Sequence, residues 1–323
     1  MVKRTPAQTQ EDKIVRAQKR AGRTLRDQQV SEVVRSRYYY AARKLRMHWN
    51  NEEVDANDDL DASLSRYVEQ LYQEGDSLSL ATDTIAAVQY FFPFSIGQLK
   101  YSWKLCAIWR KSEPPNRQKP FTSLMALGLA GLALEMDMVD MAALILVGFD
   151  AFLRTGELFG LRCFHINFMG TKAALTLGLT KSGKRRGTEE STVVNSPIAT
   201  KALHAACNGR SPTELVRQRS PAHCRAILKH LLHYFELDTT TYNWYSLRRG
   251  GATAFFVKTS SMERTLIRGR WEAATTARIY IQEATASVGE LSLSPNQTLL
   301  FRRSAGQFSS LVDLRCRRLH QEG

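Results

Sequence analysis

The chain has 323 residues, of which 43% are hydrophobic and 24% charged, and its formal net charge is +14. This composition excludes a mostly disordered, fibrous or membrane-embedded chain, and the longest apolar run, Leu124–Leu134, is too short to span a bilayer. No secretory signal pattern is present and the five cysteines form no Cys-x-x-Cys pair, which predicts an intracellular protein with no membrane association.

The charge is unevenly distributed along the chain. Residues 1–46 carry 13 Lys or Arg against 4 acidic residues, whereas residues 51–80 carry 9 acidic residues against one Arg. A net positive charge of this size favours polyanionic partners, nucleic acid above all. Residues 1–35 lack apolar periodicity and are rich in Gln, Lys and Arg, so we predict a flexible or marginally helical basic arm.

Residues 36–113 have the pattern of a small all-α domain. Aromatic residues flank Arg43 and Lys44 in the first helix, which makes these two cations candidate DNA contacts. Asp59 precedes the second helix as an N-cap, and its apolar residues recur at helical spacing up to Gly75. The four predicted helices span residues 38–49, 59–75, 79–92 and 96–111.

A Pro-rich linker at residues 114–120 precedes a second domain, predicted over 121–290. Apolar helices over 124–134 and 138–153 give way to alternating Leu175, Leu177 and Leu179, which is typical of a strand. A basic turn containing Lys184, Arg185 and Arg186 follows, and residues 192–194 form the returning strand. We therefore predict a mainly α fold with a small β-hairpin or sheet, an α+β second domain.

Helical patterning resumes at residue 197, and the predicted C-terminal tail, 291–323, contains one amphipathic stretch around Phe308. This stretch is a candidate subunit contact. The pairs His204-x-x-Cys207 and His223-Cys224 lack two further ligands at suitable spacing, so no metal site is expected. No phosphate-binding Gly-rich loop and no Ser-His-Asp arrangement is found, and we expect neither a metal nor a nucleotide cofactor.

Three segments place cationic or aromatic donors where a core would exclude them. Arg154 directly follows an apolar helix, and Glu157 lies one turn further on as its partner. Tyr245 and Arg248 share one face at a helix start, before a Gly pair. Trp271 follows a Gly-Arg dipeptide, with a tyrosine nine residues further on, Tyr280.

Taken in order, these three segments resemble the active-site motifs of the tyrosine recombinase, or phage-integrase-like, family. The resemblance covers about residues 36–290, with Trp271 lying 23 residues after Arg248. It implies that Tyr280 is the nucleophile and that Lys181, or Lys184 on the same turn, is the general acid. Guanidinium groups suit the negative charge of a phosphorane-like state without a metal. The implied catalytic residues are Arg154, Lys181, Tyr245, Arg248, Trp271 and Tyr280, with Glu157 orienting the site.

The resemblance further implies site-specific DNA recombination or integration through a 3′-phosphotyrosyl intermediate. Residues 36–113 are similar to the family's SAM-like core-binding domain, and the implied partners are double-stranded DNA and three further copies in a homo-tetramer on two DNA sites. The sequence Leu-Arg-Arg-Gly-Gly-Ala-Thr is similar to that of eukaryotic, retroelement-type members of the family. This similarity implies a mobile element and a nuclear location.

The sequence departs from the family at Tyr245. The family has a His-x-x-Arg motif that ends at the second catalytic arginine, here Arg248, and Tyr245 occupies the position of its His. Tyr is a poor proton acceptor near neutrality because its pKa is about 10. Two alternatives therefore stay open beside a recombinase: a catalytically decayed DNA-binding protein, and an enzyme similar to type IB topoisomerases.

Overall fold

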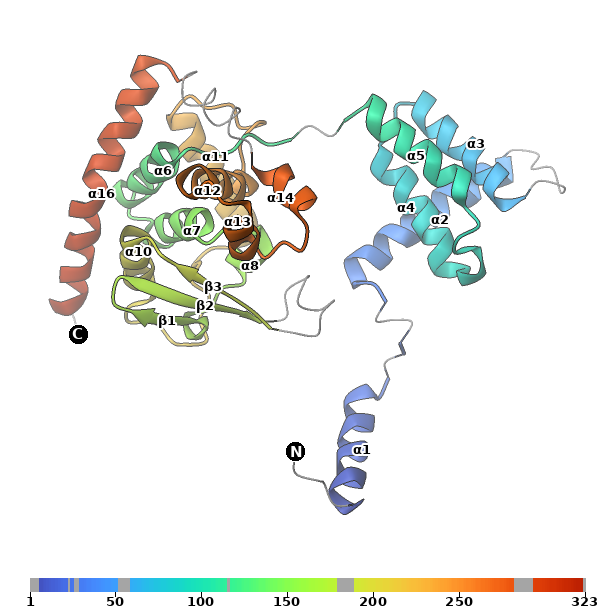
Figure 1. Ribbon diagram of the computed structural model, residues 1–323, viewed down its shortest axis with the longest axis horizontal. Coiled ribbons are helices and arrows are strands. Elements are labelled where there is room, and N and C mark those ends of the chain that lie inside the picture. Colours follow the sequence, from blue (N-terminus) through green and yellow to red (C-terminus); the bar gives the residue numbers. More distant parts are fainter. Residues whose placement is uncertain are drawn as a thin grey trace. The chain divides into compact units, whose positions relative to one another are not determined.

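The computed structural model describes residues 6–22, 24–25, 29–51, 59–114, 117–178, 189–281 and 293–321. The chain divides into two compact units, Met1–Asn116 and Arg117–Gly323 (Figure 1). The boundary falls inside the Pro-rich segment. None of the helices in these ranges combines the length and the apolar character that crossing a bilayer requires.

The N-terminal unit is helical throughout its described part. Asp59 and Ser77 begin the third and fourth helices, and their side chains accept hydrogen bonds from the backbone N–H groups of Ala62 and Leu80. Its helices are α1 (Pro6–Arg20), α2 (Glu32–Asn51), α3 (Leu60–Gln73), α4 (Leu78–Phe91) and α5 (Lys100–Ser112). Its core is formed by Leu45, Leu64, Val68, Leu71, Ile85, Val88 and Trp109.

The segment predicted as a flexible or marginally helical basic arm, residues 1–35, contains α1 and the start of α2 at Glu32. The last helix begins at Lys100 rather than near Ile96, so that prediction was wrong at its start. Gly97 adopts a left-handed conformation (φ 84°) after the 3₁₀ turn Pro93–Ser95, and this conformation interrupts a right-handed helix.

The C-terminal unit packs helices around a large hydrophobic core, with a second small cluster at Phe152 and Trp271, and against a small antiparallel sheet (Figure 1). This confirms the predicted mainly α fold with a small sheet. Its helices are α6 (Ser123–Glu135), α7 (Val139–Asp150), α8 (Thr155–Phe159), α10 (Pro197–Cys207), α11 (Pro221–Tyr234), α12 (Trp244–Thr259), α13 (Met262–Gly269), α14 (Ala274–Tyr280) and α16 (Pro295–Gln321). Its strands are β1 (Ile166–Met169), β2 (Lys172–Gly178) and β3 (Glu190–Val194).

The sheet has the order β1-β2-β3, one strand more than the predicted hairpin. The sequence analysis missed β1 because it has only four residues and no long alternating pattern. It joins β2 through a tight turn in which Gly170 has a φ of 60°. A register shift between Thr176 and Gly178 places Gly178 opposite Glu190. The first residue of β3 is thus an acidic one, Glu190, and it lies opposite a residue without a side chain.

Helix α16 packs along α6 of the same unit, at the edge of the structure in Figure 1. Phe308 is only 1% exposed there, so the prediction that the stretch around it forms a subunit contact was wrong for this residue. Close approach of the two helices depends on Gly128 and Gly131, where a Cβ atom would collide with Phe301 and with the carbonyl oxygen of Ser304. The apolar face of α16 therefore completes the core of its own unit.

We expect Gly131→Ala to destabilise the protein by about 1–3 kcal/mol, because the added methyl group overpacks the α6–α16 contact. Gly306→Ala is the matched control. Gly306 lies in α16 with open space around it, and Ala there should stabilise the helix by about 0.5–1 kcal/mol. Urea-induced unfolding monitored by circular dichroism measures both variants. Equal effects of the two substitutions would contradict the packing.

Candidate active site

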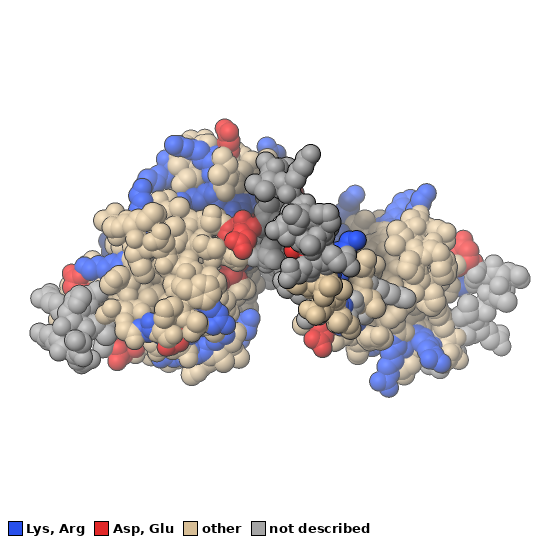
Figure 2. Space-filling model, turned by 90° about the horizontal axis from the view of Figure 1, so that it is seen from below, with Lys and Arg blue, Asp and Glu red and all other residues tan. Residues whose placement is uncertain are grey.

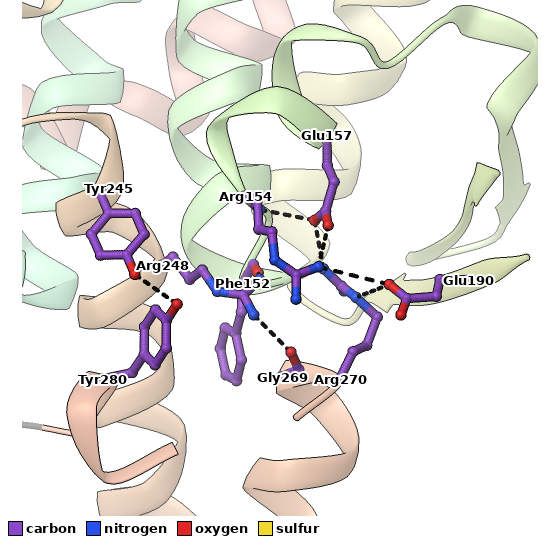
Figure 3. A network of polar contacts seen from close by, with 9 residues as sticks. All are labelled: Phe152, Arg154, Glu157, Glu190, Tyr245, Arg248, Gly269, Arg270 and Tyr280. Atoms are coloured by element: carbon purple, nitrogen blue, oxygen red, sulfur yellow. Dashed lines mark hydrogen bonds and ion pairs between the residues drawn. The ribbon is translucent and has the colours of Figure 1, made fainter. Parts of the chain in front are cut away.

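The chain turns sharply between α7 and α8, and this turn presents the first arginine. Phe152 adopts a left-handed conformation (φ 50°), after which Arg154 is extended and forms the N-cap of α8. The Glu157 carboxylate accepts a hydrogen bond from the Arg154 backbone N–H (2.9 Å) and another from its Nη1 (2.6 Å). One side chain thus caps the helix and holds the guanidinium (Figure 3).

The same carboxylate binds a second guanidinium, that of Arg270. Arg270 Nη2 lies 2.6 Å from Glu157 Oε2, and its Nε lies 3.4 Å from Glu190 Oε2. Glu190 also lies 3.8 Å from Arg154 Nη1. Arg270 has a left-handed backbone (φ 56°), a conformation that costs a non-glycine residue about 1–2 kcal/mol. The ion pairs with two buried carboxylates offset this cost.

Helix α12 carries two consecutive arginines into the interior. Arg248 is fully buried and Arg249 is 2% exposed. The following Gly250 and Gly251 make this possible, because a Cβ atom at either position would collide with the backbone of Phe121 or Phe149. The Gly pair therefore lets the helix approach its neighbours closely.

The Arg248 guanidinium is held by main-chain carbonyl groups. Its Nη1 donates to the carbonyl oxygen of Phe152 and its Nη2 to that of Gly269 (2.8 Å). It lies over the rings of Trp271 (4.9 Å to the centroid) and Tyr280 (5.2 Å). Burial lowers the pKa of Arg248, and its cationic neighbours add to this effect, yet a guanidinium remains protonated at neutral pH.

Tyr280, the last residue of α14, lies beside Tyr245 of α12 (Figure 3). The Tyr245 hydroxyl donates to the Tyr280 hydroxyl over 2.6 Å, and the Tyr280 ring stacks on Trp271 with centroids 4.6 Å apart. Burial, and then the hydrogen bond to Tyr280, raise the pKa of Tyr245 above its ordinary value. Tyr245 is therefore a neutral hydrogen-bond donor across the physiological pH range.

The cluster has spare hydrogen-bond donors. The cluster contains three guanidinium groups, those of Arg154, Arg248 and Arg270, and two carboxylates, those of Glu157 and Glu190, which leaves one net positive charge. Among the described residues, Trp271 Nε1, Arg248 Nε and Arg270 Nη1 are buried and have no hydrogen-bond partner. A cationic site with unused N–H groups is suited to an oxyanion such as a phosphodiester.

The structure brings together Arg154, Glu157, Tyr245, Arg248, Trp271 and Tyr280 of the predicted set. Lys181, Lys184, Arg185 and Arg186 lie outside the described residues. On α2, Arg43 is exposed and Lys44 lies 3.7 Å from Asp76. No three His, Cys, Asp or Glu side chains group as metal ligands in the described ranges.

Two further residues of the cluster, Arg270 and Glu190, were not predicted from the sequence. Arg270 stands between Gly269 and Trp271, in a segment that had been singled out, but nothing in the sequence shows its left-handed backbone. Glu190 follows another acidic residue at the start of a strand, where a surface position is the ordinary expectation. Its burial is the signal, and burial becomes visible only in the structure.

No protein-family model matches the sequence, and no curated protein matches it. Solved structures do: a lambda integrase dimer bound to a COC′ core site has a TM-score of 0.57 at 13% identity, covering 87% of this chain and 82% of that one. The XerH site-specific recombinase bound to difH substrate has a TM-score of 0.56 at 11% identity, covering 79% of each chain. The Tn1549 transposon integrase bound to transposon right end DNA has a TM-score of 0.58 at 11% identity, covering 82% and 95%.

These structural neighbours are tyrosine recombinases and integrases. At this low identity the likeness establishes a shared fold. The mostly helical chain with its three-stranded antiparallel sheet has the fold of the tyrosine recombinase catalytic domain.

We expect Arg270→Gly to destabilise the protein, although glycine suits the left-handed backbone. Of the described cations, the substitution leaves only Arg154 within ion-pairing distance of the buried Glu190 carboxylate, at 3.8 Å. Breaking a buried ion pair costs about 3–5 kcal/mol. Relief of the backbone conformation returns about 1–2 kcal/mol. Urea-induced unfolding measures the net loss.

The double variant Arg270→Gly/Glu190→Gln removes the buried carboxylate together with its partner. It should recover part of the stability lost in Arg270→Gly, and Glu190→Gln alone completes the double-mutant cycle. Strictly additive effects would show that Arg270 and Glu190 do not interact.

Proposed function

We propose that the protein cleaves and rejoins double-stranded DNA in site-specific recombination or integration, through a 3′-phosphotyrosyl intermediate on Tyr280. The observation that carries the proposal is the contact of the Tyr280 ring with the Arg248 guanidinium and the Trp271 indole. A phenol is thereby placed beside unused cationic and N–H donors. The fold shared with recombinases that were solved on DNA supports the same conclusion.

In the proposed reaction the Tyr280 oxygen attacks the scissile phosphorus and the bond to the 5′ oxygen breaks. Arg154, Arg248 and the Trp271 Nε1 group stabilise the negative charge that builds on the non-bridging oxygens. Glu157 orients Arg154 through its two hydrogen bonds. Lys181 or Lys184 supplies the proton to the leaving 5′ oxygen. The phosphotyrosyl bond conserves the phosphodiester energy, so rejoining requires no ATP.

Tyr245 acts in this scheme as a donor rather than as a base. Its raised pKa keeps the phenol protonated, and its hydroxyl donates to the Tyr280 oxygen. The proton of Tyr280 therefore passes to solvent water, and the Tyr245 O–H group stabilises the resulting negative oxygen. This assigns to Tyr245 a role that differs from proton acceptance by His.

On the face drawn in Figure 2, basic side chains are exposed on both units. In the C-terminal unit a cavity of about 380 Å³ beside Tyr245 is lined by Arg225 and Lys229. We propose that these residues, with Lys184, Arg185, Arg186, Arg43 and Lys44, contact DNA phosphates. By analogy with the lambda integrase tetramer solved on a Holliday junction, we propose a homo-tetramer on two DNA sites. Origin in a eukaryotic mobile element, a SAM-like N-terminal unit and a nuclear location stay predictions.

We expect Tyr280→Phe to abolish strand cleavage while leaving folding and DNA affinity intact, because the substitution removes only the attacking oxygen. The substrate is a nicked suicide duplex that carries the DNA flanking the gene, labelled on the 3′-phosphate side of the cut. Wild-type protein should retain the label under denaturing conditions, and Tyr280→Phe should not. Peptide mapping of the adduct identifies the tyrosine.

The same assay separates the alternatives. An adduct that maps to Tyr245 would move the nucleophile to α12. Binding without any adduct in wild-type protein would favour a decayed DNA-binding protein. Relaxation of supercoiled plasmid without strand exchange between sites would favour a topoisomerase similar to type IB.

We expect cleavage to survive EDTA, because guanidinium groups stabilise the transition-state charge. Arg154→Ala and Arg248→Ala should each slow single-turnover cleavage by at least about 10²-fold. Arg→Lys at either position should rescue little, since a point charge does not reproduce the guanidinium fork. Complete inhibition by EDTA with recovery on adding magnesium would contradict this mechanism.

A further inference from the structure

We propose that Arg249 is a positioning residue for Tyr280: its guanidinium ties the end of α14 to the segment through which the chain enters the C-terminal unit. This inference rests on the proposed function of Tyr280. Arg249 follows the predicted catalytic Arg248 on α12, and the resemblance gave it no role.

Arg249 is a buried cation, and among the described residues its hydrogen-bond acceptors are two main-chain oxygens. Its Nη1 donates to the carbonyl oxygen of Gln118 (2.7 Å) and its Nη2 to that of Ile279 (2.7 Å). Within the described part of the chain, no carboxylate oxygen lies within ion-pairing distance of it, whereas Arg270 and Arg268, which are partly buried, each have such a partner. Because burial of an unpaired charge is costly, the two carbonyl groups are its principal compensation.

The Ile279 carbonyl belongs to the last turn of α14, one residue before the proposed nucleophile. Helix ends leave carbonyl groups without intrahelical partners, and a cation there is favourable. Helix α14 has only seven residues, too few to be stable alone. Thr253 Oγ1, one turn along α12, donates to the Tyr280 carbonyl oxygen over 3.2 Å. Side chains of α12 thus cap the turn that carries Tyr280.

The other hydrogen bond of Arg249 fixes the entry segment. Gln118 lies in that segment, and the residues after it are also bound to the α12 region. The Lys119 N–H donates to the Thr241 carbonyl (2.9 Å) and the Phe121 N–H to the Ser246 carbonyl (3.2 Å). One guanidinium fork therefore sets the distance between the entry segment and the end of α14. A single ammonium group cannot span both carbonyl oxygens in this way.

The test compares Arg249→Lys with Arg268→Lys in the full-length protein. Both arginines donate to main-chain carbonyls, but Arg268 on α13 directs its hydrogen bonds to Asp150 rather than to α14, and its side chain is 11% exposed. Lysine keeps the charge and one of the contacts, so both variants retain a folded structure. Arg249→Met, which removes the charge as well, extends the series.

Four measurements are made on each variant: the thermal unfolding midpoint, amide hydrogen exchange of residues 274–281, affinity for duplex DNA, and the single-turnover cleavage rate on the suicide substrate. We expect Arg249→Lys to accelerate exchange in α14 and to slow cleavage by about 10- to 100-fold, the scale of a misplaced reacting group. DNA affinity should not change. Arg268→Lys should lower thermal stability without either effect.

Unchanged exchange in α14 would overturn the proposal, and so would a loosened helix with wild-type cleavage. A wild-type protein that forms no adduct would instead remove the proposed function, and with it the nucleophile that Arg249 positions. Failure of this inference alone is recognised by a wild-type adduct together with full activity of Arg249→Lys.

Discussion

The site depends on one carboxylate, that of Glu157. It caps α8 through the Arg154 N–H, fixes the Arg154 guanidinium and pairs with Arg270 at the end of α13. These contacts join segments more than 100 residues apart in the chain. Burying guanidinium groups together is unfavourable unless carboxylates and carbonyl oxygens compensate them. Glu157, with Glu190 on β3, supplies that compensation while leaving one positive charge for a ligand.

A second constraint is the close packing of α12. Its Gly pair allows the helix to approach the entry segment and the end of α7, and the two preceding arginines reach opposite parts of the unit. Arg248 joins the α7–α8 turn to the end of α13, whereas Arg249 joins the entry segment to α14. The described segments that carry predicted active-site residues are thereby all in contact with α12 or with Glu157.

The sequence was sufficient for the elements and residues that local pattern determines. Helices with clear apolar periodicity, the strand around Leu175 and the Arg154–Glu157 pair follow from spacing within a few residues. The grouping of Arg154, Arg248, Trp271 and Tyr280 followed from resemblance, and the structure places these side chains together. Arg270 and Glu190 could not be predicted from the sequence, because their ion pair joins β3 to the end of α13. Neither burial nor a left-handed φ can be inferred from the identity of one side chain. The same reason applies to Phe308, whose partner helix lies far away in the chain.

The left-handed backbone of Arg270 has a consequence at the level of the gene. Every arginine codon becomes a glycine codon by one base change, and the local conformation favours that change. The buried carboxylates of Glu157 and Glu190 oppose it. A relative that carries glycine at position 270 lacks the nearer of the two described cations beside the acid at position 190, so these two positions are expected to change together as sequences diverge.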